Sequence, residues 1–308
     1  MLAVVNTPHN RTPVELREIP EPMPATDEAM VAVHAFSLNR GELRSFRDNE
    51  EEWRPGQDIA GVVLRPAADG SGPRAGTRVV ALMDEAGWAE RAAVPTQRLA
   101  VLPEEVSFAQ AATLPVAGLT ALRTLRFGAP LLGRRVLVTG ATGGVGHLAV
   151  QLAARSGARV TAVIGSPERG TGLRELGAAE VVQGMESAEG RFALILESAG
   201  GASLAAAIRL IAPKGTVVVF GNSSGEPTTL GFADFRGAAN ARVQSFSYFT
   251  SEPEGRFADD LALLVALVAE GSLHPQIGAE RSWRDIISVA EDPRERRVRA
   301  KAVLLVET

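Results

Sequence analysis

A glycine-rich turn between a predicted strand and a predicted helix constrains the fold of this chain more than any other feature. Residues 135–139 read Arg-Val-Leu-Val-Thr, an apolar run that is typical of a strand covered on both faces. The turn Gly140-Ala-Thr-Gly-Gly-Val-Gly146 follows directly, and a helical pattern over residues 145–156 ends at Gly157. A strand, a glycine-rich turn and a helix in this order are the context that supports a dinucleotide-binding fingerprint.

The glycines of such a turn have distinct physical roles. They let the chain reverse tightly, allow a pyrophosphate to approach the backbone and bring the helix close to the sheet. The helix N-terminus then holds the phosphates with its N–H groups and its dipole. We therefore expect a pyrophosphate beside Thr142, Gly143, Gly144, Val145 and Gly146. The first glycine of the fingerprint is an alanine here, no Gly-Lys-Ser/Thr follows to make a P-loop, and a turn without a ligand is the alternative.

The end of the next predicted strand indicates which nucleotide the turn would hold. An NAD-preferring site places an acid there, about 20 residues after the glycines, on the ribose 2′-hydroxyl. The strand at 159–164 is instead followed by Gly-Ser-Pro-Glu-Arg, in which Ser166 and Arg169 are suited to bind a 2′-phosphate. This pattern predicts NADPH as the cofactor. Two alternatives stay open: Arg169 is an ordinary exposed arginine, or Glu168 turns inward.

Strands and helices alternate along the middle of the chain, which predicts βαβ units and a parallel sheet. The first third instead shows short strands separated by Pro and Gly turns, typical of a compact, mostly β domain. After residue 250, an amphipathic helix over 257–269 and a strand at 302–306 are too short for a domain, so we expect this tail to pack on the N-terminal part.

The predicted fold class is therefore α/β, with a doubly wound parallel sheet and a second, mostly β domain. We expect a catalytic domain that begins with residues 1–115, a dinucleotide-binding domain over 116–250, and a return to the catalytic domain over 251–308. Within the parallel sheet, residues 173–177 are predicted to end a helix. The apolar segment 243–249 is predicted to be the last strand.

Composition excludes several other classes of protein. The chain has 308 residues and no cysteine, which excludes disulfides, thiolate zinc sites and cysteine nucleophiles. The four histidines are scattered, and we expect no metal site. A net charge of −4 argues against nucleic acid or an anionic membrane as a partner. The N-terminus lacks the pattern of a signal peptide, and the longest apolar run, 261–269, falls short of the ~20 residues of a membrane span, so we expect a cytoplasmic protein.

Segments spread through nearly the whole chain resemble the medium-chain dehydrogenase/reductase superfamily. The nearest resemblance is to its zinc-independent quinone oxidoreductases, the zeta-crystallin-like branch. The segments that carry it are 37–42, 56–61, 111–121, 140–151, 176–178 and 220–225. The zinc alcohol dehydrogenases of the same superfamily bind zinc through Cys and His, and Gln57 stands here in place of one such His.

The resemblance implies a GroES-like catalytic domain, split in sequence around a Rossmann domain, with the substrate between them. It also implies NADPH, homodimers, and hydride transfer to quinones or to activated C=C bonds. By position, Asn39 would lie near the nicotinamide ribose and the substrate, and Thr120 near the pyrophosphate. The other implied cofactor contacts are Ser166, Arg169, Phe220, Gly221 and Asn222.

One departure from the family pattern concerns the substrate side. Arg44 stands where many relatives have a tyrosine, and the family's Gly-Lys near the C-terminus is Ala300-Lys301. Because no metal is expected, negative charge that develops on a substrate oxygen needs a hydrogen-bond donor. We take Asn39 and Arg44 as the candidate catalytic residues, and a solvent-exposed Arg44 is the alternative.

These observations favour a metal-independent, NADPH-dependent oxidoreductase that acts on a small molecule, a quinone or an enone. Two alternatives are a pathway-specific enoyl or polyketide-tailoring reductase of the same fold, and a non-catalytic NADPH-binding protein. The apolar edge at 243–249 predicts a homodimer. The basic run over 294–301 is interpreted as a solvated segment, because the whole chain is acidic.

Overall fold

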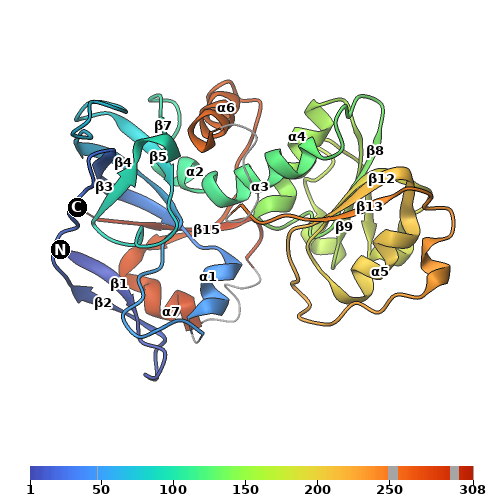
Figure 1. The fold of residues 1–308 in the computed structure, drawn as a ribbon, viewed down its shortest axis with the longest axis horizontal. Helices are drawn as coiled ribbons and strands as arrows, with labels where there is room; N and C mark the ends of the chain where they lie inside the picture. The colour runs from blue at the N-terminus through green and yellow to red at the C-terminus, as the bar shows by residue number, and fades with distance from the viewer. Residues whose placement is uncertain (47, 249–255, 292–297, 308) are drawn as a thin grey trace. The chain divides into compact units, whose positions relative to one another are not determined.

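The computed structural model describes residues 1–46, 48–248, 256–291 and 298–307, with the backbone only at 290 and 291. The chain divides into two compact units (Figure 1). Unit 1 comprises Met1–Leu119 and Pro253–Thr308, and unit 2 comprises Thr120–Glu252. Each unit has a sheet of its own and a separate hydrophobic core.

Unit 2 contains a six-stranded sheet in which all neighbouring strands are parallel. The strand order is β10-β9-β8-β11-β12-β13, so the direction of winding reverses between β8 and β11. In open parallel sheets, ligands bind beyond the carboxyl ends of the strands at such a reversal. The strands are β8 (Arg135–Val138), β9 (Arg159–Ile164), β10 (Ala178–Gln183), β11 (Phe192–Glu197), β12 (Ile211–Val219) and β13 (Arg242–Ser245).

Helices cover this sheet because its central strands are apolar on both faces. Helix α4 (Gly144–Arg155) contacts β8, β9 and β10, and helix α5 (Gly201–Leu210) contacts β11 and β12. Leu137, Ile195 and Ala207 pack in one cluster that joins the sheet to α5. Helix α3 (Pro115–Arg126) precedes β8 in the chain. The short 3₁₀ elements of this unit are η2 (Pro167–Gly170), η3 (Met185–Ser187) and η4 (Phe232–Phe235).

Unit 1 is built mainly from antiparallel strands. Its larger sheet has seven strands, in the order β14-β15-β3-β4-β5-β7 with β6 paired to β3, and β1 and β2 form a separate pair. The strands are β1 (Leu2–Asn6), β2 (Val14–Glu18), β3 (Glu28–Ser37), β4 (Asp58–Arg65), β5 (Arg78–Leu82), β6 (Arg91–Pro95), β7 (Leu99–Val101), β14 (Ile277–Ser282) and β15 (Lys301–Leu305). The helices are α1 (Arg40–Ser45), α2 (Phe108–Ala112), α6 (Phe257–Ala269) and α7 (Ile286–Glu291). No described helix is long and apolar enough to cross a membrane.

The C-terminal tail returns to unit 1, as the sequence predicts. Strand β15 pairs antiparallel with β3, so that Leu304 lies opposite Phe36 (Figure 1). Phe36 also stacks on Trp88, with ring centroids 5.3 Å apart, and meets the edge of Trp283 of the tail at 6.4 Å. All three aromatic side chains are buried. The tail therefore supplies both a strand and part of the core, and the predicted fold class of a parallel sheet with a second, mostly β unit is confirmed.

Two details of the sequence prediction need correction. Residues 173–177 do not end a helix, because η2 is followed by turns up to Gly177. Pro167 and two glycines, of which Gly172 has a φ of 83°, oppose a continuous α-helix there. The last strand of the sheet is found where it was expected, but β13 ends at Ser245, and residue 249 lies outside the described residues.

Candidate functional site

The turn between β8 and α4 has the close backbone packing that its glycines suggest. Gly140 has a φ of 57°, in the left-handed region that glycine tolerates, and its carbonyl oxygen accepts a hydrogen bond from the N–H of Gly143 at 2.9 Å. A Cβ atom at Gly146 would lie 2.2 Å from the Gly140 carbonyl oxygen. The first turn of α4 therefore packs directly on the end of β8, and any side chain at Gly146 would force them apart.

The N-terminus of α4 is the candidate anion site at the reversal point. The first N–H groups of a helix have no partner within the helix, and they attract anions together with the helix dipole. In the turn that leads into α5, a side chain of the chain itself accepts the backbone N–H groups that precede the helix. The buried Glu197 carboxylate accepts hydrogen bonds from the N–H groups of Ala199 at 3.0 Å and Gly200 at 2.9 Å. At α4 the N-cap is Gly143, which has no side chain to do the same. Thr142, Gly144 and Val145 complete this turn, and Thr142 is buried.

The turn from β11 to α5 is a part of the site that the sequence prediction missed. The Ser198 N–H donates to Thr139 Oγ1 at 2.8 Å, and the Thr139 hydroxyl lies 3.3 Å from the Glu197 carboxylate. Thr139 directly precedes Gly140, so these bonds tie the glycine-rich turn to the neighbouring strand. The sequence signal for this turn is a second succession of a strand, the segment Glu-Ser-Ala-Gly-Gly and a helix, which spans residues 192–210.

The segment expected to lie beside the nicotinamide is attached to the same turn. The Phe220 N–H donates to the Glu197 carbonyl, and the Ser223 N–H donates to the Ser198 carbonyl, both at 2.9 Å. Phe220 and Gly221 are half-buried, and Asn222 is exposed. The turn after β11 therefore brings the 220–223 segment and the glycine-rich turn together.

The two residues expected at a 2′-phosphate follow β9, and Glu168 stands between them. Ser166 and Arg169 are half-buried, and Glu168 is exposed. Its own N–H and the Ser166 hydroxyl hydrogen-bond the Glu168 carboxylate, and these bonds lower its pKa. An anionic carboxylate therefore lies against Ser166, although Glu168 is exposed and does not turn inward. Thr120, also expected at the cofactor, is buried in α3, where its carbonyl accepts the Thr124 hydroxyl at 2.6 Å.

The candidate catalytic residues lie in unit 1, where Asn39 belongs to a buried network of charges. The Asn39 side-chain amide donates to Glu42 at 3.1 Å and to Asp58 at 3.0 Å. Its oxygen accepts from the Lys301 ammonium at 2.6 Å. Glu42, Asp58 and Lys301 are all buried. Sequence reasoning singled out Asn39 but not this network, because its members are far apart in the chain.

Arg44 is the other candidate donor, and it lies on the same helix as Glu42. The two residues are two positions apart on α1, so they do not share a helix face. Glu42 faces the interior and Arg44 is exposed. Arg44 therefore lies on the solvent side of α1, which is the alternative that the sequence left open.

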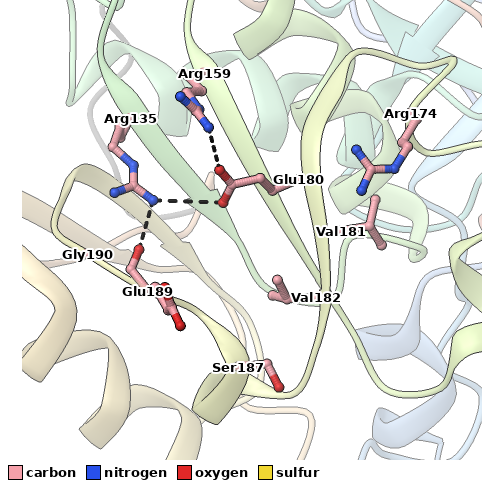
Figure 2. A pocket seen from close by; sticks show the side chains of 9 residues that line it. All are labelled: Arg135, Arg159, Arg174, Glu180, Val181, Val182, Ser187, Glu189 and Gly190. Carbon is pink, nitrogen blue, oxygen red and sulfur yellow. Dashed lines mark hydrogen bonds and ion pairs between the residues drawn. The ribbon is translucent and has the colours of Figure 1, made fainter.

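A hollow of about 550 Å³ lies at the other end of the parallel sheet (Figure 2). Arg135 and Arg159, the first residues of β8 and β9, both face Glu180 there (Figure 2). The Arg159–Glu180 ion pair spans 2.7 Å and the Arg135–Glu180 pair 3.8 Å. Because this hollow is at the amino ends of the strands, and Arg135 and Arg159 already have a carboxylate partner in Glu180, we do not take it as the active site.

Comparison with known proteins places this architecture in a family. The family model described as a zinc-binding dehydrogenase matches residues 144–266. A chloroplast envelope quinone oxidoreductase homolog from Arabidopsis thaliana is 39% identical over 181 residues, which are 54% of this chain and 55% of that protein. A quinone oxidoreductase from Pongo abelii is 29% identical over 292 residues, with 89% of this chain and 88% of that protein covered. These matches support the resemblance of the chain to the medium-chain dehydrogenase/reductase superfamily, in its quinone oxidoreductase branch.

Some relatives are much longer than the segment that aligns with this chain. The chain spans about half the length of the Arabidopsis protein, 55%. It spans 12% of a spectinabilin polyketide synthase system protein from Streptomyces orinoci, to which it is 35% identical over 263 residues. Among solved structures, the Escherichia coli quinone oxidoreductase complexed with NADPH aligns with a TM-score of 0.85 and 20% identity, covering 99% of this chain and 100% of that one. This likeness shows the shared fold.

The name of the matching family model refers to zinc, and the side chains of this chain that could bind a metal ion bear on that point. Within the described residues, no group of three or more His, Asp or Glu side chains is placed to hold a metal ion. The chain also has no cysteine. No cysteine ligand is therefore available for zinc in this chain.

A first prediction concerns the helix that packs on the glycine-rich turn. Gly146→Ala would place a Cβ atom 2.2 Å from the Gly140 carbonyl oxygen and push α4 away from β8. We expect NADPH binding, measured by calorimetry, to weaken at least ~tenfold, which is ~1.4 kcal/mol. The matched control is Gly231→Ala, where the nearest atom to a Cβ is 3.8 Å away. Equal affinities for the wild type and both variants would contradict the assignment of this turn.

A second prediction concerns the pH dependence of stability. Burial raises the pKa of Glu42 to about 8, and the nearby Asp58 adds to the rise. Because the folded pKa lies above the ordinary value of 4.5, folding takes up a proton between these two pH values, and the stabilisation decreases as the pH rises from 4.5 and is lost once it passes 8. The free energy of unfolding should therefore fall between pH 4.5 and pH 8, and fall less in Glu42→Gln. Urea unfolding followed by tryptophan fluorescence measures it, and equal slopes in both proteins would contradict the assignment.

Proposed function

We propose that this protein is an NADPH-dependent oxidoreductase that transfers hydride to a quinone or to an activated C=C bond. The observation that carries the proposal is the N-terminus of α4, which approaches the end of β8 without any side chain at Gly143 or Gly146. It lies at the reversal point of a parallel sheet, where dinucleotides bind in this architecture. Relatives named as quinone oxidoreductases support the reaction class.

The residues of unit 2 fit the phosphates of the cofactor. Backbone N–H groups at Gly144, Val145 and Gly146 would hold the pyrophosphate, because a Cβ at Gly146 would close the cradle. Ser166 and Arg169 would hold the 2′-phosphate, with the guanidinium as a charge-assisted donor. The remaining proposed cofactor contacts are Thr120, Thr142, Gly143, Phe220, Gly221 and Asn222. When bound, the cofactor supplies the hydride, and the protein supplies binding and orientation.

On the acceptor side, we assign Asn39 and Arg44 to the reacting end of the cofactor. A substrate oxygen gains negative charge as hydride arrives, and a permanent cation at Arg44 would stabilise that charge. Asn39 already donates its amide hydrogens to Glu42 and Asp58. Its contribution is therefore to orient a bound group, and Arg44 is the stronger candidate for the donor.

A second candidate function is that of an enoyl or polyketide-tailoring reductase. It is supported by the 35% identity over 263 residues to the polyketide synthase system protein. Both functions use the same cofactor and the same fold, and they differ in the acceptor. A non-catalytic NADPH-binding protein is the remaining alternative from the sequence.

We also propose that the protein works as a cytoplasmic, metal-independent homodimer with small-molecule partners. Strand β13 lies at the edge of the sheet, and all four of its residues are exposed. An open edge strand is a template for pairing with another chain. Phe232, near this edge in the chain, is 91% exposed, which also favours a protein contact.

The test of the proposed function is NADPH oxidation with a panel of quinones, enones and enoyl thioesters. Turnover with quinones or simple enones supports the first proposal. Turnover restricted to enoyl thioesters supports the second candidate. NADPH binding without turnover of any acceptor would make the chain a binding protein and overturn both.

A third prediction tests the choice of cofactor. Loss of a charge-assisted hydrogen bond typically costs ~1.5–3 kcal/mol, so Arg169→Ala should weaken NADPH binding about tenfold or more and leave NADH binding nearly unchanged. Dissociation constants for both nucleotides are to be measured by calorimetry. The control is Arg174→Ala, an exposed arginine whose Nη1 donates to the Ala179 carbonyl. Equal weakening of both nucleotides in Arg169→Ala would count against the 2′-phosphate assignment, and a preference for NADH would implicate Glu168.

A fourth prediction concerns Arg44. If its charge acts mainly on the transition state, kcat should fall more than KM rises in Arg44→Ala and Arg44→Tyr. Removal of one such donor typically lowers the rate by ~10²–10³. Steady-state kinetics on the best acceptor measures this, with Arg40→Ala on the same helix as the control. Unchanged kcat in both Arg44 variants would remove Arg44 from the mechanism.

A further inference from the structure

A buried lysine stands out in a chain whose basic residues are almost all arginine. Of the 32 Lys and Arg residues, only Lys214 and Lys301 are lysines. Lys214 is exposed, whereas Lys301, the first residue of β15, is 3% exposed. A buried ammonium is unfavourable unless its charge and its three donors all have partners.

Three oxygen atoms surround the Lys301 ammonium within hydrogen-bond distance. Nζ lies 2.9 Å from Asp58 Oδ2, 2.6 Å from Asn39 Oδ1 and 3.0 Å from the Leu38 carbonyl oxygen. These three contacts use all the donors of the ammonium. A compact ammonium suits such a site, whereas the planar fork of an arginine would not reach the same three acceptors.

The carboxylates of the network are equally well bound. Asp58 also accepts from the Ser37 hydroxyl at 2.6 Å and from the Val116 N–H at 2.8 Å. Glu42 accepts from the N–H groups of Gly56 at 3.0 Å and Gln57 at 2.9 Å. The backbone segments at 38–39 and 56–57 are therefore held by buried side chains, the first by Lys301 and Glu42 and the second by Glu42.

Asn39 lies between the positive and the negative members of this network. Its amide oxygen faces the Lys301 ammonium, and its amide nitrogen faces Glu42 and Asp58. Reversal of the amide would bring its NH₂ group to the ammonium and its oxygen to two carboxyl groups. The surrounding charges therefore fix which way the amide faces, which a neutral environment would leave open.

We propose that Lys301 is a positioning residue for Asn39. Its ammonium holds the amide oxygen and offsets the charge of Asp58, so that the amide keeps one orientation. Both amide hydrogens are then committed, and Asn39 meets a ligand as an acceptor, through the second lone pair of its oxygen. A hydrogen-bond donor, such as a hydroxyl group, is the ligand chemistry that this orientation selects. This assignment rests on the proposed function, in which Asn39 lies at the reacting end of the cofactor.

The first test reads the Asn39 amide directly and needs no turnover. The side-chain amide signal of Asn39 is assigned in ¹⁵N spectra by its loss in Asn39→Asp. We expect a slowly exchanging amide in the wild type and in the control Lys214→Met, and a shifted, faster-exchanging one in Lys301→Met. An unchanged Asn39 signal in Lys301→Met would overturn the proposal.

If Lys301→Met does not fold, the wild-type protein still provides a test. Selective ¹⁵N labelling of lysine gives only two side-chain signals, because the chain has two lysines. The Lys301 ammonium signal should be protected from exchange and should shift in Asn39→Ala. Absence of any shift would show that the two side chains are not coupled and would overturn the proposal.

Activity then separates positioning from stability. The double variant Asp58→Asn with Lys301→Met removes both charges of the buried pair, and such neutral replacements often retain stability. We expect its unfolding midpoint to recover relative to Lys301→Met, while kcat stays lower than in the wild type by the order of 10²-fold, since small misplacements have effects of that size. If kcat recovered together with stability in the double variant, the role of Lys301 would be structural only, and the proposal would be overturned. If the wild type turns over no acceptor, the proposed function fails, and the amide signal alone decides the role of Lys301.

Discussion

The contact between the first turn of α4 and the end of β8 is the constraint on which the cofactor half of this protein depends. It is a contact of backbone with backbone, possible only because position 146 has no side chain. It directs the N-terminus of α4 at the carboxyl end of the sheet. At the neighbouring α5, the Glu197 carboxylate accepts the N–H groups of Ala199 and Gly200, which precede the helix, and so holds the turn in place.

Unit 1 is organised around buried charges rather than by close backbone packing. Two carboxyl groups and one ammonium are removed from water around Asn39, and each is surrounded by hydrogen-bond partners. Buried pairs of this kind add little net stability, but removal of one partner is strongly destabilising, by ~3–5 kcal/mol. Their effect is to specify one arrangement of β3, β4 and β15. The C-terminal strand must return to this sheet because Asp58 needs the charge that Lys301 brings.

The sequence predicted the features that depend on local pattern. Continuous apolar runs located β8, β9 and β11, and the glycine spacing located the start of α4, because each signal is contained in a few consecutive residues. The helix expected to end at Gly177 was wrong, since Pro167 and the glycines that follow it outweighed the Leu-Arg-Glu-Leu pattern. The network around Asn39 could not be predicted, because Lys301 lies 262 residues from Asn39 and only the pairing of β15 with β3 brings them together.

The structure also changes the role that we propose for Asn39. An amide that faced solvent would donate to a substrate oxygen, and the sequence left that role open. In the folded chain the amide hydrogens of Asn39 already bond the carboxyl groups of Glu42 and Asp58. A charged carboxylate is a better acceptor than a neutral carbonyl. A substrate oxygen could take such a hydrogen only by leaving a buried carboxyl group with one partner fewer, which is unfavourable. In the proposed reaction the donor is therefore a group outside this network, and the exposed, permanently charged Arg44 is the donor that we propose.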